Sequence, residues 1–87
     1  MYSFSNKRAL IIGGTSGIGK ATTSQLLSEG VEVHIVGRSP HKVEDQNGLV
    51  KHKVDITNRA EVDQLIGELK KLDSIDFLVN ASGIFGP

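Results

Sequence analysis

Residues 9–19 read Ala-Leu-Ile-Ile-Gly-Gly-Thr-Ser-Gly-Ile-Gly, an apolar run followed by a glycine-rich loop. The first proline of the chain is Pro40, so the residues after the loop can form a helix. In a strand–loop–helix context, such a loop brings backbone N–H groups close to a phosphate, with the positive end of the helix dipole behind them. The stretch therefore predicts binding of a nucleotide through its pyrophosphate.

The rest of the chain alternates predicted strands and helices. Short apolar or β-branched runs predict strands over residues 8–12, 31–36, 50–54 and 75–79. Helical spacing of apolar residues predicts helices over 18–29 and 58–72, and a short helix that Ser39 caps and Pro40 opens. Thr57 or Asn58 is expected to cap the 58–72 helix, and Asn58 with Glu61 has capping-box spacing.

This βαβαβαβ order predicts an α/β protein. We expect a Rossmann-type parallel sheet of four strands in the order 3-2-1-4, with helices on both faces. The switch point of that order falls between the first and fourth strands, where ligands bind in open α/β sheets. The loops after Ile12 and Val79 should therefore meet at the ligand site.

The glycine loop also satisfies a second pattern. Gly14 to Lys20 fits the P-loop spacing G-x-x-x-x-G-K. Ala21 then stands where a P-loop needs a hydroxyl for Mg²⁺, Thr22 is one residue late, and the fourth strand ends in Asn80 rather than an aspartate. These departures disfavour the P-loop, which remains open together with a glycine turn that binds nothing.

The end of the second predicted strand bears on the choice of dinucleotide. An acidic residue at this position would bind the ribose 2′-hydroxyl of NAD, whereas an arginine accommodates the 2′-phosphate of NADP. The sequence here is Gly37-Arg38, and Lys42 lies one helical turn further on. With no carboxylate to repel a phosphate and a guanidinium to bind it, the sequence favours NADP(H) over NAD(H).

Taken together, the motifs resemble those of the short-chain dehydrogenase/reductase family, from Arg8 onward. Gly13-x-x-x-Gly17-Ile18-Gly19 resembles its cofactor signature, Val54-Asp55-Ile56 the end of its third strand, and Asn80-Ala81-Ser82-Gly83 its Asn-Asn-Ala-Gly motif. The chain departs from the family at Ile12, where threonine is usual, at Ala81, which replaces the second asparagine, and in the short segment 38–50.

The resemblance implies a role for each matching residue. It implies a pyrophosphate loop made of Gly13, Thr15, Ser16, Gly17, Ile18 and Gly19. Arg38 would bind the 2′-phosphate, and Asp55 and Ile56 the adenine. Asn80, Ala81 and Gly83 would line the ribose side. The implied function is the NADP(H)-binding portion of an oxidoreductase that transfers hydride between a nicotinamide cofactor and a carbonyl or alcohol substrate.

Catalytic residues of the family type are missing from the 87 residues. The family uses a serine and a Tyr-x-x-x-Lys pair beyond the fourth strand, but the single tyrosine here is Tyr2, followed four residues later by Asn6. We therefore expect residues 1–87 to form one NAD(P)-binding domain, the amino-terminal portion of a longer enzyme and inactive alone. A non-catalytic dinucleotide-binding module is the alternative.

The composition of the chain limits the classes of partner that we expect it to bind. Ten basic and ten acidic residues cancel, which gives no global charge to attract nucleic acid or an acidic membrane. Cysteine is absent, the three histidines have no metal-ligand spacing, and no segment has the length of a signal peptide or a membrane span. We expect a cytoplasmic protein without a metal. It should form homo-oligomers through the edge of the fourth strand or through the 58–72 helix.

Overall fold

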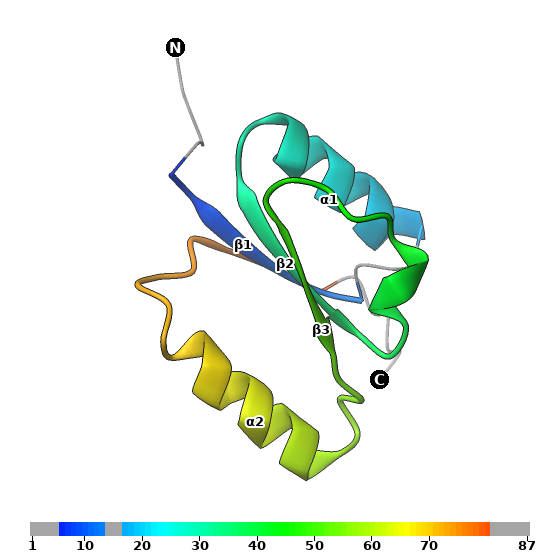
Figure 1. The fold of residues 1–87 in the computed structure, drawn as a ribbon, viewed down its shortest axis with the longest axis vertical. Helices are drawn as coiled ribbons and strands as arrows, with labels where there is room; N and C mark the ends of the chain where they lie inside the picture. The colour runs from blue at the N-terminus through cyan, green and yellow to red at the C-terminus, as the bar shows by residue number, and fades with distance from the viewer. Residues whose placement is uncertain (1–5, 14–16, 81–87) are drawn as a thin grey trace.

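A computed structural model describes residues 6–13 and 17–80, without the side chain of Ile18. Within them the chain forms alternating strands and helices (Figure 1). In order these are β1 (Arg8–Ile12), α1 (Gly17–Ser28), β2 (Glu32–Gly37), the 3₁₀ helix η1 (Pro40–Lys42), β3 (Leu49–Lys53), α2 (Arg59–Leu69) and β4 (Phe77–Asn80). Each predicted strand and helix is present, with ends shifted by at most three residues.

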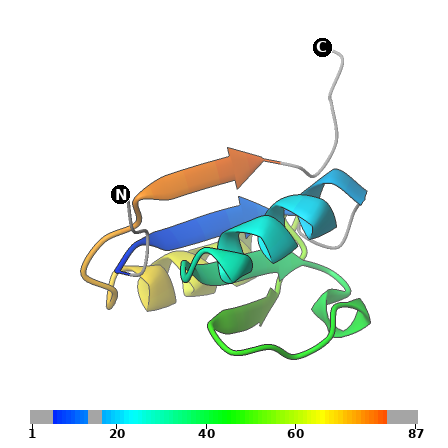
Figure 2. The same cartoon turned by 90° about the horizontal axis from the view of Figure 1, so that it is seen from above.

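The strands form one parallel sheet in the order β3-β2-β1-β4, which confirms the predicted fold class. Figure 2 shows β1 and β4 running side by side in the same direction. The two strands pair although 64 residues separate Ile12 from Phe77, because α1, β2, β3 and α2 all lie between them in sequence. β3 is an edge strand, as its alternating lysines predicted.

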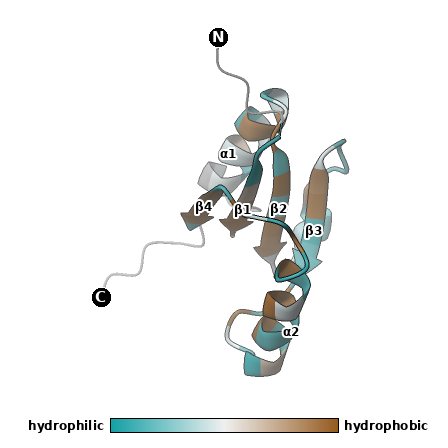
Figure 3. Cartoon of the chain, turned by 90° about the vertical axis from the view of Figure 1, so that its left-hand side faces the viewer, coloured by the Kyte–Doolittle hydropathy of each residue, from teal (hydrophilic) through white to brown (hydrophobic). Residues whose placement is uncertain are grey.

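Alternating residues of the strands build a separate core on each face. The α1 face holds the larger core, in which Leu26 and Leu27 of α1 pack against fully buried aliphatic residues. Those buried residues are Ala9, Ile11, Val31, Val33, Ile35 and Val43. Side chains that alternate along a strand point to opposite faces, so Leu10 and Val36 face the other way, toward α2. The strand interiors are correspondingly hydrophobic (Figure 3).

The α2 face is covered more sparsely. Leu65 is the buried residue of α2, and it packs with Leu10, Val36 and Val54. A cavity of about 260 Å³ lies between α2 and β3. Leu78, which pairs with Leu10 in the register of the sheet and so shares its face, is 67% exposed. α2 therefore shields β2 and β3 better than it shields β4.

Two local expectations were wrong. Ser39 precedes η1 but makes no side-chain capping hydrogen bond, since the fixed geometry of Pro40 is enough to open one 3₁₀ turn. α2 ends at Leu69 rather than at residue 72, and turns follow it. Within α1 the side chain of Thr23 is buried, and its hydroxyl donates to the carbonyl of Gly19 at 2.7 Å.

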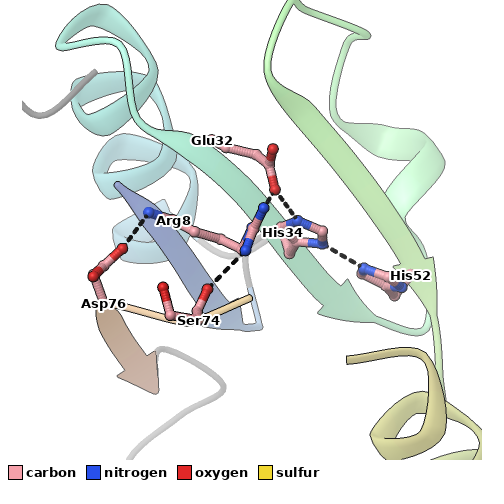
Figure 4. A network of polar contacts seen from close by, with 6 residues as sticks. All are labelled: Arg8, Glu32, His34, His52, Ser74 and Asp76. Carbon is pink, nitrogen blue, oxygen red and sulfur yellow. Dashed lines mark hydrogen bonds and ion pairs between the residues drawn. The ribbon is translucent and has the colours of Figure 1, made fainter. Parts of the chain in front are cut away.

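A polar network crosses the α2 face near the amino ends of the strands (Figure 4). Glu32 accepts from Nε of Arg8 and from Nε2 of His34, the latter at 2.7 Å. His34 in turn contacts His52 of β3, with 2.9 Å between its Nδ1 and Nε2 of His52. Nδ1 of His52 lies 3.6 Å from a carboxylate oxygen of Glu68 in α2. The network thus joins three strands to the helix that covers them.

Candidate dinucleotide-binding site

The four strands present their carboxyl ends at one edge of the sheet. Ile12 pairs with Val36 on one side and with Asn80 on the other, and Gly37 pairs with Lys53. The residues that follow these positions therefore lie along one edge. This arrangement brings together the predicted site positions that the structure describes: Gly13, Gly17, Gly19, Arg38, Asp55, Ile56 and Asn80.

Gly13 and Gly19 of the first loop have different structural roles. Gly13 has φ of 82°, a conformation that favours glycine, and its N–H donates to the carbonyl of Val36 at 2.7 Å. Gly13 therefore shapes the turn out of β1, and its own N–H belongs to the sheet. Gly19 is buried in the first turn of α1. Thr15, Ser16, Ala81 and Gly83 lie outside the described residues.

Gly17 and Gly37 face open space. A Cβ built on either glycine would meet no heavy atom within 4 Å among the described residues, and neither has a positive φ. Nothing in the packing of the described chain therefore requires glycine at these two positions. Small residues beside open space at the carboxyl ends of β1 and β2 fit the close approach of a phosphate and a ribose.

The loop after β3 is tied to the end of β2. The N–H of Val54 donates to the carbonyl of Gly37 at 2.9 Å, which holds the loop beside Arg38. Arg38 is exposed. Hydrogen bonding from Thr57, whose hydroxyl and N–H donate to Oδ1 of Asp55 at 2.6 and 2.9 Å, lowers the pKa of the Asp55 carboxyl, and the positive charge of Arg38 adds a smaller effect in the same direction. Asp55 is therefore an ionised acceptor at neutral pH.

Ile56 completes this loop as an apolar surface. It lies in a turn between two polar residues, and its apolar side chain is 50% exposed. The side chain of Asn58 caps α2 by accepting from the N–H groups of Ala60 and Glu61 at 3.0 and 3.2 Å. The carboxylate of Glu61 accepts from the N–H of Asp55 at 3.0 Å. Sequence reasoning missed the contacts of Thr57 and Glu61 with Asp55, and the capping-box spacing of Asn58 and Glu61 was the signal that could have found them.

These features fit a dinucleotide. The edge offers open space at two glycines, an exposed guanidinium, a carboxylate acceptor and an exposed apolar side chain that can lie against a base. Within residues 6–13 and 17–80 no cluster of histidine, aspartate and glutamate has the geometry of a metal site. Among the described helices, none has both the length and the apolar character needed to cross a membrane.

Comparison with known proteins identifies the family. The family model for short chain dehydrogenases matches residues 7–87. The chain therefore belongs to the short-chain dehydrogenase/reductase family, as the motifs predicted.

Individual relatives agree with this assignment. An uncharacterized oxidoreductase of Staphylococcus haemolyticus is 36% identical over 97% of this chain, which spans 39% of that protein's length. A short chain dehydrogenase from Leptospira borgpetersenii, solved with bound NAD⁺, superposes with a TM-score of 0.79 and 28% identity over 97% of this chain and 35% of its own. A variant of the protein ElxO with NADPH bound gives a TM-score of 0.72 and 31% identity over 90% of this chain and 35% of its own. Similar folds thus hold either dinucleotide.

Proposed function

We propose that this chain binds NADP(H) and forms the cofactor-binding domain of an oxidoreductase. In the complete enzyme, the bound nicotinamide would exchange hydride with a carbonyl or alcohol carbon. Residues 1–87 form this one domain. The glycine loop binds the pyrophosphate, Arg38 the 2′-phosphate, and Asp55 and Ile56 the adenine. Asn80, Ala81 and Gly83 line the ribose side.

The observation that carries the choice of NADP(H) is the pairing of Gly37 with Arg38 at the end of β2. The space beside Gly37 is open, and no carboxylate occupies it among the described residues. The exposed guanidinium of Arg38 follows directly and can bind a phosphate with two hydrogen bonds. The loop that carries Asp55 is hydrogen-bonded to Gly37, so the residues that we propose for adenine and for the 2′-phosphate are neighbours.

Calorimetric titration with NADPH and NADH tests this proposal. We expect NADPH to bind more tightly than NADH, and Arg38→Ala to weaken NADPH binding by roughly tenfold or more, as for the loss of a charged hydrogen bond. Gly37→Asp should reverse the preference, because the open space accepts the carboxylate without a clash. Lys70→Ala, which removes an exposed cation beyond the far end of α2, is the matched control. Equal affinities of the unmodified chain for both dinucleotides would contradict the proposal.

The alternative is a non-catalytic dinucleotide-binding module. Both proposals have the chain bind the cofactor. Under both proposals the isolated 87 residues should not oxidise NADPH in the presence of a carbonyl compound, because they contain no tyrosine–lysine pair to protonate the alkoxide. Saturable NADPH oxidation by the pure chain would contradict both.

A further inference from the structure

The amino end of α2 differs from an ordinary capping box. In that motif, the acidic residue three positions after the cap returns its carboxylate to the N–H of the cap residue. Here the cap residue is Asn58, and its N–H donates instead to the carbonyl of Asp55 at 2.9 Å. The carboxylate of Glu61 extends past the cap and accepts from the N–H of Asp55. Glu61 therefore holds the backbone of Asp55 itself.

The side chain of Asp55 is held by a different residue, Thr57. Its Oδ1 accepts both donors of Thr57, and no described residue binds its Oδ2. Glu61 fixes the backbone and Thr57 fixes one carboxylate oxygen, so the remaining oxygen points in a defined direction. The exocyclic amino group of adenine is a donor, and a carboxylate oxygen can only accept.

We propose that Glu61 is a positioning residue for adenine recognition, which acts by holding Asp55 so that its carboxylate can accept from the adenine amino group. This inference rests on the proposed binding of NADP(H). Glu61 acts through its acceptor oxygen rather than through its charge. A glutamine at this position keeps that oxygen and should keep the function, whereas an alanine loses it.

The test compares NADPH with its hypoxanthine analogue, in which a carbonyl oxygen replaces the amino group of adenine. The unmodified chain should bind NADPH roughly tenfold more tightly than the analogue, the effect expected of one hydrogen bond to a charged group. Glu61→Ala should bring this ratio close to one, and Glu61→Gln should preserve it. Asp63→Ala, which removes an exposed carboxylate two residues further along α2, should leave the ratio unchanged.

The ratio of the affinities for NADPH and for its analogue distinguishes a positioning role of Glu61 from a purely structural one. If Glu61→Ala merely unfolded part of the protein, the affinities for NADPH and for the analogue would fall by the same factor. A ratio that stays high in Glu61→Ala overturns the inference and leaves the proposed function standing. An unmodified chain that binds NADPH and its hypoxanthine analogue equally does the same. An unmodified chain that binds neither overturns the proposed function, and the inference with it.

Discussion

At the scale of a single residue, Gly17 is a position where a substitution should affect cofactor binding but not the stability of the fold. Its φ is not positive and a Cβ there would meet no described heavy atom, so the described chain tolerates a side chain. We predict that Gly17→Ala changes the free energy of unfolding by no more than about 0.5 kcal/mol. The same change should weaken NADPH binding by roughly tenfold or more, because the methyl group takes space at the phosphate loop and separates charged hydrogen-bonding partners.

Gly48 is the matched control for this prediction. It has φ of 86°, and a Cβ there would lie 3.5 Å from a side-chain carbon of Leu27. Gly48→Ala should therefore destabilise the fold by about 1–2 kcal/mol, the cost of a left-handed alanine, without changing cofactor affinity per folded molecule. Urea unfolding and calorimetric titration of both variants measure the two quantities. Equal losses of stability in the two variants would show that Gly17 serves the fold after all.

The histidine pair is the clearest pH-sensitive feature at the scale of the elements. The carboxylate of Glu32 only accepts, so His34 donates from Nε2, and its Nδ1 accepts from Nε2 of His52. Burial, and then the proximity of His34, lower the pKa of His52, although Glu68 opposes both effects. A base with a lowered pKa takes up protons more readily in the unfolded chain, so its contribution to stability is complete above the unfolded pKa and is lost as the pH falls.

We therefore predict a loss of stability as the pH falls below about 6.5, the ordinary pKa of histidine. His52→Leu removes the titrating group, and its unfolding free energy should change less between pH 7.5 and pH 5.5 than that of the unmodified chain. His41→Leu, which alters an exposed histidine in η1, should retain the full pH dependence. Urea unfolding at the two pH values provides the measurement. If the unfolding free energy of His52→Leu changes between the two pH values as much as that of the unmodified chain, the prediction is wrong.

The sequence was sufficient for the elements and their order, because apolar runs, glycine stops and the βαβ handedness rule act locally. It was insufficient where a polar group finds its partner only in the folded chain. Thr23 is buried because its hydroxyl bonds within α1, and His34 is buried because Glu32 and His52 surround it. Glu61 looked like an ordinary capping residue until the fold placed Asp55 within its reach.

At the scale of the whole molecule, β4 forms one edge of the sheet. Among the described strands β4 pairs with β1, and Leu78 on this strand is 67% exposed on the face that α2 leaves open. An edge strand that carries an exposed apolar side chain favours association with another chain. We predict that the 87-residue protein associates into dimers or larger species through the β4 edge or through α2, and that Leu78→Lys shifts it toward the monomer.

Sedimentation equilibrium over a wide concentration range measures this association. Val50→Lys is the control, because Val50 is 39% exposed on β3 at the opposite edge of the sheet. It should leave the association constant unchanged, whereas an effect equal to that of Leu78→Lys would place the interface elsewhere. A cooperatively folded monomer at the highest concentration would contradict the prediction for both surfaces.

The position of β1 has a consequence for how the protein comes into being on the ribosome. β1 is made first, yet it occupies the interior of the sheet, and its neighbour β4 is made last among the described strands. The backbone groups along one side of β1 therefore wait until Phe77–Asn80 have left the exit tunnel. Because pairings between distant segments form slowly, the apolar strand β1 stays open to non-native pairing along that side until β4 has been made.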